Sequence, residues 1–460
     1  MKNPSFQAAQ TAEMKTVLGA DKKLIGILRN EGRPVSVSLP LAAIESVRSF
    51  QDVLDELSIE GKINVAHKAT SSLALISAIK GHATIDVASE AELANALEVG
   101  FASSDISATG PKSTKFLKQL VDHETTIIID SLGELNRLIA LLRRDNEVTV
   151  LLRITRTLLN IPSIDKKSRF GFDQENLSQA LSLIQAQKSI KFRGIAFHLD
   201  SQSIEERQYA VRQSLDLLID IQAAFPHATI LDIGGGYGAS YGITPDDIEH
   251  YDNTVRHALK DNNKTSSWQS RTFGLSYDGT RVRGELTGVD MFRSEVGAER
   301  LHKILSFQDA SGTTLAELIR ESLIELWIEP GSSIFSDAGI FATEVLDVCT
   351  RDGDNFIVVD AHRNQICFEG NEHIADPVLI PQQILNSDSL EAFIAGHLCM
   401  ESDLMMYRKI TLPAVPQPGD IIVWLHTGAY RSYFSASNSI GHPNAAKYTL
   451  VNGILQKEEV

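Results

Sequence analysis

The chain has 460 residues, 43% of them hydrophobic and 22% charged, which is the composition of an ordinary globular protein. Its formal net charge of −16 argues against nucleic-acid and anionic-membrane partners, and no apolar run approaches the roughly 18 residues of a membrane span. The three cysteines, Cys349, Cys367 and Cys399, fit neither a disulfide framework nor a zinc pattern, so no metal site and a reducing, cytoplasmic location are expected.

From about residue 61 the chain alternates short apolar runs with helical patterns. The expected strands are 62–67, 84–88, 105–109, 126–130, 148–153, 194–198, 229–233 and 323–328. Helical stretches, such as 90–99, 132–143 and 204–224, separate most of them. Eight strand–helix units predict an α/β fold, a parallel (β/α)8 TIM barrel, whose chemistry lies at the carboxyl ends of its strands.

After Gly331 the pattern changes to strand-like runs separated by turns, at 341–348, 356–359, 421–425 and 448–451. These runs predict a second, mainly antiparallel β domain. We therefore expect an N-terminal segment (1–45) that packs with the β domain, a barrel (46–335) and the β domain itself (336–460). The stretch between the seventh and eighth barrel strands exceeds one crossover, so an insertion at about 245–305 is expected. It would cover the active site or form an oligomer contact.

Lys68 ends the first barrel strand. Desolvation by the apolar surroundings there is expected to lower the lysine pKa and give a nucleophilic amine. Such an amine can bind an aldehyde cofactor covalently. Downstream, Gly234, Gly235 and Gly236 offer backbone N–H groups to a phosphate, and Glu329 offers a carboxylate to a pyridinium nitrogen. Together these residues predict an enzyme that uses pyridoxal 5′-phosphate.

Further residues complete the predicted site. The cofactor site is also expected to include Asp86, Arg153, His198, Ser201, Gly331 and Tyr430. His198 would back the cofactor ring, while Ser201 and Tyr430 would contact the phosphate. Cys399 is the candidate acid that returns a proton to the substrate Cα after CO2 leaves.

As an ordered set, these residues resemble the fold-type III pyridoxal phosphate decarboxylases, the family of diaminopimelate, ornithine and arginine decarboxylases. The bacterial diaminopimelate decarboxylases look most similar. The resemblance rests on residues 65–69, 86–93, 168–171, 198–201, 234–236, 329–331, 399–403 and 428–430. It implies a barrel of the alanine racemase type and a homodimer with shared active sites. Cys399, Glu401 and Asp403 would reach the partner's site and, with Tyr430, contact the substrate.

Departures from the family pattern bear on the substrate. Diaminopimelate decarboxylases follow Glu-Pro-Gly with an arginine that helps bind the distal carboxylate, but here Ser332 stands there. A second arginine is replaced in the region of Cys367, and Arg363 has the wrong spacing. Losing both cations penalises a distal carboxylate, whereas the acidic Glu401 remains. The resemblance therefore favours D-lysine or D-ornithine, decarboxylated to cadaverine or putrescine. Asp200, where a glycine is customary, is unfavourable near a phosphate unless it faces away.

Several alternatives remain open on the same scaffold. One is decarboxylation of meso-diaminopimelate, of an L-diamino acid or of a siderophore precursor. Another is an amino-acid racemase, although those enzymes usually place an arginine at the ring nitrogen, where Glu329 stands here. A third is a non-catalytic regulator, against which the retained Lys68 argues.

Overall fold

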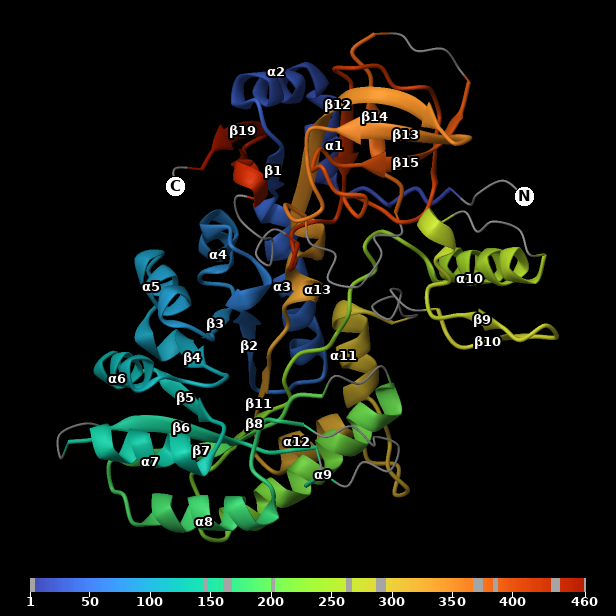
Figure 1. Cartoon of the computed structure of the whole chain (residues 1–460). Coiled ribbons are helices and arrows are strands. Elements are labelled where there is room, and N and C mark those ends of the chain that lie inside the picture. Colours follow the sequence, from blue (N-terminus) through green and yellow to red (C-terminus); the bar gives the residue numbers. More distant parts are fainter. Residues whose placement is uncertain are drawn as a thin grey trace.

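The computed structural model describes residues 5–143, 147–156, 158–159, 168–199, 203–261, 267–286, 295–366, 375–383, 388–431 and 439–458. Within them the chain forms a barrel and a separate β domain (Figure 1). The barrel strands are β2 (Gly61–Ala66), β3 (Thr84–Val87), β4 (Ile106–Ala108), β5 (Thr126–Ile129), β6 (Val148–Arg153), β7 (Ile190–Ala196), β8 (Ile230–Asp232) and β11 (Glu325–Ile328). All are parallel, and β11 closes the barrel between β8 and β2. The predicted (β/α)8 barrel is confirmed.

Helices surround the barrel, and most of them begin at a side-chain cap. They are α3 (Pro40–Glu56), α4 (Leu73–Ile79), α5 (Glu90–Glu98), α6 (Thr114–Asp122), α7 (Leu132–Leu141), α8 (Gln174–Gln185), α9 (Ile204–Gln222), α11 (Gly297–Leu305) and α12 (Leu315–Glu321). The cap side chains of α4 to α9 accept a hydrogen bond from the first helical turn; the caps are Ser72, Ser89, Ser113, Ser131, Asp173 and Ser203. Capping sets where each helix starts, and hence how long each loop at the barrel mouth is.

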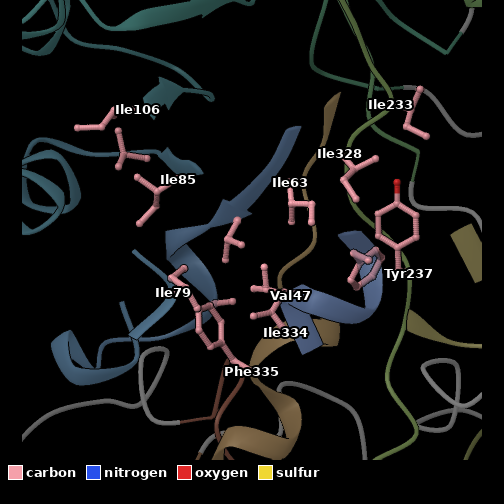
Figure 2. Packing of buried hydrophobic residues seen from close by; sticks show 14 of the residues in the cluster. Val47, Ile63, Ile79, Ile85, Ile106, Ile233, Tyr237, Ile328, Ile334 and Phe335 are labelled. Atoms are coloured by element: carbon pink, nitrogen blue, oxygen red, sulfur yellow. The ribbon is translucent and has the colours of Figure 1, made fainter. Parts of the chain in front are cut away.

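The barrel strands point alternate side chains toward the helices and toward the interior. Figure 2 shows part of the helix-facing core, in which Val47 of α3 lies near Ile63 of β2. On the inward side of β2, Asn64 donates to Ser107 at 2.5 Å, and Ser107 donates to Asp86 at 2.9 Å. The opposite half of the interior is apolar and contains Ile128, Leu151, Ala196, Ile230 and Trp327. The barrel is therefore filled, with its polar half under β2–β4.

The β domain is a mixed, mainly antiparallel sheet, as predicted. Its strands are β1 (Val35–Ser38), β12 (Gly339–Arg351), β13 (Asp354–Val359), β14 (Val378–Ile380), β15 (Leu390–Ala395), β16 (Ile410–Leu412), β17 (Ile421–Trp424), β18 (Ala446–Val451) and β19 (Ile454–Lys457). Among the described strands of this sheet, only β1–β18 and β13–β15 pair in parallel. A core around the fully buried Trp424 holds the sheet together.

The N-terminal segment reaches the β domain. It forms α1 (Ala12–Gly19), α2 (Asp21–Glu31) and β1, and β1 pairs with β12 and β18. Helix α3 spans the domain boundary expected at residue 46. At the other boundary, the short helix α13 (Ser332–Phe335) leads from the barrel into β12.

The crossover from β8 to β11 contains the extra chain. Helix α10 (Pro245–Lys260) and the hairpin β9 (Ser276–Tyr277) with β10 (Val282–Arg283) precede α11. In Figure 1 this part lies beside the β domain, whereas α11 packs on α3 and α9 as a barrel helix. The ring of Trp268 makes edge contacts with Phe356 and Phe393, both at 5.5 Å between centroids. No helix of the described residues is long and apolar enough to cross a membrane.

Candidate active site

Lys68 lies in a short 3-10 turn, η1 (His67–Ala69), directly after β2. Two backbone hydrogen bonds fix this turn. The Ala66 N–H donates to the carbonyl of Pro330 at 3.1 Å, and the Tyr430 N–H donates to the last carbonyl of the turn at 2.7 Å. The end of β11 and a loop of the β domain thus hold the lysine from two sides.

The charge of Lys68 is governed by the groups around it. Burial lowers the pKa of the amine, but Tyr430, Glu329 and Asp86 more than offset this effect, so the pKa is raised overall. The expectation of a lowered pKa was wrong, because it considered desolvation without the acidic neighbours. Without a bound cofactor, Lys68 is an ammonium ion at neutral pH.

Asp86 is buried at the end of β3 and hydrogen bonded on both oxygens. Ser107 donates to Oδ1 at 2.9 Å, and Thr109 donates to Oδ2 at 2.5 Å. Burial is the main reason that its pKa rises to about 8, and the nearby Glu329 adds to the rise. The carboxyl therefore gains a proton easily, and two hydroxyl groups fix its position near Lys68.

Asp232 and Glu329 form a close carboxyl pair across the ends of β8 and β11. Burial raises the pKa of both groups. Their shared hydrogen bond lowers the pKa of Asp232, whereas the charge of Asp232 and the same bond raise the pKa of Glu329. Asp232 is fully buried, and its Oδ1 accepts the N–H of Gly234 at 2.8 Å. A cationic ring nitrogen placed against Glu329 would relieve the repulsion within this pair.

His198 follows β7 and contacts the glycine loop. Its Nδ1 accepts the N–H of Gly235 at 3.2 Å, so the ring carries its proton on Nε2. Burial, together with the smaller effects of the Lys68 and Arg153 charges, lowers its pKa to about 3, although the residue is exposed to solvent. Protein atoms therefore surround the imidazole of His198, but a face of its ring stays accessible. His198 is a neutral, flat surface at the barrel mouth.

The three glycines after β8 cannot carry side chains. A Cβ on Gly234 would lie 2.6 Å from the Phe197 carbonyl oxygen, and one on Gly235 would lie 2.5 Å from the Glu329 carbonyl oxygen. Gly234 and Gly236 also adopt positive φ angles of 67° and 93°. Only glycine lets the backbone approach this closely. The result is an open backbone cradle beside His198 and Glu329.

Arg153 ends β6 and faces the same region. Its Nη1 lies 3.6 Å from Oδ1 of Asp130, and its guanidinium covers the ring of Phe170 at 4.6 Å. The N–H of Phe172 donates to the Arg153 carbonyl at 2.7 Å. The segment around Phe170 therefore packs against the arginine and holds it at the strand end.

Tyr430 joins the β domain to this site. Its residue adopts a left-handed φ of 58°, and burial raises the pKa of the phenol. A Cβ on Gly331 would lie 2.8 Å from the phenol oxygen, so a side chain there would displace the phenol. The structure thus brings Lys68, Glu329, Gly331 and Tyr430 together.

The loop from His397 to Asp403 lies on the β domain. Cys399 and Glu401 are exposed, whereas Asp403 is 3% exposed. Both Asp403 oxygens accept backbone N–H groups, Oδ1 from Arg363 at 2.9 Å and Oδ2 from Leu398 at 2.7 Å. Asp403 therefore shapes the loop. Within the described part of one chain, no hydrogen bond or ion pair joins this loop to the barrel mouth.

Two arginines flank Tyr407 beside this loop. Arg363 donates through Nη1 to the Ser402 carbonyl at 3.0 Å and to the Tyr407 hydroxyl. The Arg271 guanidinium, from the insertion, lies 3.5 Å from the centre of the Tyr407 ring. Among the residues that the structure describes, neither guanidinium forms an ion pair. The spacing in the sequence argued against Arg363 as a substitute for the second arginine of the family. In the fold, Arg363 contacts Ser402, the residue after Glu401.

The sequence analysis missed some residues of the site, and some that it named lie outside the described residues. Ser201, with Asp200 and Cys367, lies outside the described residues. Asp232 was overlooked, although it lies only two positions before the glycine run. Arg207, which is fully buried behind that run, was also missed, because an arginine in a helical pattern normally indicates a solvated face.

Comparisons with known proteins agree with this geometry. Residues 43–270 match the family described as "Pyridoxal-dependent decarboxylase, pyridoxal binding domain". The chain is 26% identical to the uncharacterized protein y4yA of Sinorhizobium fredii, covering 97% of this chain and 94% of that one. It is 24% identical to a diaminopimelate decarboxylase of Bacillus methanolicus, covering 93% and 90%. A lysine/ornithine decarboxylase structure from Vibrio vulnificus, complexed with cadaverine, shares the fold, with a TM-score of 0.66, 18% identity and coverage of 96% and 100%.

The residues present fit pyridoxal 5′-phosphate. The glycine cradle leaves space that a Cβ would fill, and backbone of this kind suits a phosphate. Lys68 can bind the aldehyde carbon, Glu329 can accept a hydrogen bond from the ring nitrogen, and His198 can face the ring. The cofactor expected from the sequence is thus matched by the local geometry.

Proposed function

The chain belongs to the pyridoxal-dependent decarboxylases, and from this premise we propose that it removes CO2 from an α,ω-diamino acid, with meso-diaminopimelate as the first candidate. The observation that carries the choice is the charge pattern beside the His397–Asp403 loop. There, the carboxylate of Glu401 is exposed, and the guanidinium of Arg363 contacts the next residue of the chain. An acid and a cation together suit a distal group that carries both an ammonium and a carboxylate.

The bound cofactor supplies an electron sink for the carbanion that decarboxylation leaves at Cα. Glu329 keeps the proton of the ring nitrogen in place, and its partner Asp232 holds the carboxyl in position. His198 is neutral and would limit movement of a cofactor ring placed against it. Lys68 would hold the cofactor through its amine, and the same amine could carry a proton at the site.

Cys399, supplied by the second subunit of a homodimer, is our candidate for the acid that protonates Cα. It is exposed on the loop that also carries Glu401, so one segment would bring both the proton and the recognition of the distal group. This assignment is supported by the family resemblance of residues 399–403, which implies shared active sites. The homodimer and a cytoplasmic location both stay predictions.

Two arginines support the diaminopimelate assignment. Arg363 and Arg271 flank Tyr407, and neither has a carboxylate partner among the described residues. A guanidinium without a carboxylate partner in the protein suits a ligand carboxylate. They would replace the two cations that the sequence lacks at the family positions.

D-Lysine or D-ornithine is the second candidate. Its support is Ser332, which begins α13 where the diaminopimelate enzymes carry an arginine. If the distal group meets only Glu401, an ammonium without a carboxylate binds best. An L-diamino acid or a siderophore precursor would use the same residues. A racemase is disfavoured by Glu329, and a non-catalytic role by the retained Lys68.

A CO2-release assay tests the assignment. Purified protein loaded with pyridoxal phosphate is given meso-diaminopimelate and both enantiomers of lysine and ornithine. We expect the highest kcat/KM with meso-diaminopimelate. Arg363→Gln should lower that value about tenfold or more while leaving D-lysine nearly unchanged, and Arg351→Gln, on an exposed strand end, serves as the control.

Other results would change the conclusion. Faster release from D-lysine or D-ornithine, with no effect of Arg363→Gln, would favour the second candidate. No CO2 from any of these amino acids, in protein that binds the cofactor at Lys68, would contradict the proposed substrate class.

A further inference from the structure

A buried arginine stands directly behind the glycine loop. Arg207, on α9, is 0% exposed. Its Nη1 donates to the Gly235 carbonyl at 2.6 Å and to the Leu199 carbonyl at 3.3 Å, and its Nη2 donates to the Ile233 carbonyl at 3.1 Å. One guanidinium therefore ties together the segments that follow β7 and β8.

The charge of Arg207 lacks an anionic partner within the described part of the chain. Its neighbours are three carbonyl oxygens and the ring of Tyr237, whose centre lies 5.2 Å away. Its Nε has no hydrogen-bond partner, and burial lowers its pKa. A buried cation without a counter-ion is strongly unfavourable, so a position of this kind calls for an anion nearby.

The glycine loop transmits this charge toward the cradle. The Gly235 carbonyl that accepts from Arg207 belongs to the same peptide unit as the N–H of Gly236. A charged donor at the oxygen draws electron density from that peptide and makes its N–H end more positive. Gly236 is the exposed glycine of the three, whereas Gly234 and Gly235 are buried. The polarised end of the peptide is thus the end at the open side of the loop.

The contact between loop and guanidinium is tight. A Cβ on Gly236 would lie only 2.9 Å from Nη1 of Arg207. The N–H groups of Gly234 and Gly235 already donate to Asp232 and to His198. A loop with two donors engaged elsewhere needs positive charge from another source to hold a phosphate.

We propose that Arg207 is a positioning residue whose buried charge is the counter-ion of the cofactor phosphate. It fixes the glycine loop through three carbonyls and gives that loop a positive potential. The phosphate carries nearly two negative charges at neutral pH and has an anion-binding cradle in front of this cation. This role concerns the cofactor and is independent of which amino acid is the substrate.

Comparing two forms of the cofactor tests the proposal. The dissociation constants of pyridoxal phosphate and of pyridoxal, which lacks the phosphate, are measured by absorbance on the cofactor-free protein. Arg207→Gln should weaken pyridoxal phosphate about tenfold or more beyond any effect on pyridoxal. Arg212→Gln, on the same helix in an exposed ion pair with Asp216, is the matched control and should change neither constant. Equal weakening of both ligands in Arg207→Gln would overturn the proposal.

A second variant keeps the proposal testable if Arg207→Gln does not fold. Arg207→Lys retains the charge but cannot span three carbonyls, so it should preserve the preference for pyridoxal phosphate within a few-fold. In the wild type, the phosphorus-31 resonance of the bound cofactor should stay that of the dianion well below pH 6, where the free ester titrates (its pKa is about 6). A resonance that titrates as in free solution, or a lysine variant that loses the preference, would overturn it.

Discussion

Asp403 and Glu401 lie two positions apart, yet their carboxylates have different tasks. Both oxygens of Asp403 accept backbone N–H groups, whereas Glu401 faces solvent. The buried carboxylate therefore maintains the shape of the loop, and the exposed one remains available to a ligand. Sequence alone does not separate these tasks, because both residues fall in one motif.

We predict different outcomes for the two amide substitutions. Asp403→Asn puts an NH2 group opposite a backbone donor, so it should lower stability by about 1–3 kcal/mol and lower kcat/KM for every substrate. Glu401→Gln should leave the thermal midpoint unchanged and raise KM for substrates with a distal ammonium. Thermal denaturation and steady-state kinetics measure both. Equal effects on stability would contradict the division of tasks.

For single residues, the sequence predicted where a side chain lies better than it predicted the direction of its pKa shift. Lys68 and Asp86 were placed at strand ends because apolar runs mark where a barrel strand stops. The direction of the Lys68 pKa was wrong, since Asp86 and Glu329 approach it only after the barrel closes. Arg207 was missed for a related reason: its burial depends on the fold of the loop in front of it, which helical periodicity does not encode.

Among the elements, the insertion is anchored to the β domain by an aromatic contact. The ring of Trp268 packs against Phe356 of β13 and Phe393 of β15, and the backbone N–H of Trp268 donates to the Tyr407 carbonyl at 2.6 Å. Arg271 follows three residues later and stacks on Tyr407. The anchor therefore determines where that guanidinium lies.

We predict that Trp268→Ala loosens the insertion while leaving the barrel intact. The lost contact should cost about 2 kcal/mol, since the indole is only half-buried. Amide hydrogen exchange should accelerate in residues 267–286, and the kcat/KM for meso-diaminopimelate should fall more than that for D-lysine. Tyr277→Ala, at the exposed hairpin of the same insertion, is the control. Unchanged exchange in residues 267–286 would contradict the anchoring role.

The barrel elements could be predicted from sequence, and several β-domain elements could not. Barrel strands are continuous apolar runs, buried on both sides by the parallel fold, and serine caps separate them from the helices. Strands β14 and β16 have three residues each, too few to show a period. Helix α11 was assigned to the insertion, because only packing against α3 and α9 reveals it as part of the barrel.

For the molecule as a whole, the buried carboxyl groups make stability depend on pH. The folded-state pKa of Asp86 is raised to about 8, and those of Asp232 and Glu329 are raised as well. A raised pKa means that the folded state binds more protons than the unfolded state, so this contribution is complete below the unfolded pKa of about 4 and is lost as pH rises through about 8.

We predict that the thermal midpoint of the cofactor-free protein falls between about pH 5 and about pH 9. The cofactor should reduce the fall, because its ring nitrogen brings a positive charge to Glu329. Glu329→Gln, which removes one titrating group, should flatten the profile of the cofactor-free protein. Calorimetry of both forms across this range provides the measurement. A midpoint that rises with pH would contradict the assignment of these groups.

The proposed sharing of active sites between two subunits makes a prediction about activity. Lys68→Ala and Cys399→Ala should each be inactive alone, because each lacks one half of the site. When the two variants are mixed and allowed to exchange subunits, half of the dimers are mixed, and each mixed dimer has one complete site. About a quarter of the wild-type activity should return. No recovery despite proven exchange would show that each chain builds its site alone.

Strand β1 has a consequence for how the chain is made. Val35 pairs with Ala342 on one side and with Ala446 on the other, so both neighbours of this strand leave the ribosome long after it does. At roughly 5–20 residues per second, the delay is on the order of tens of seconds. During translation the nascent chain can complete its barrel while β1 still waits without partners. A ribosome-bound chain stalled before β12 would therefore expose this strand to chaperones, and release of the full-length chain would bury it.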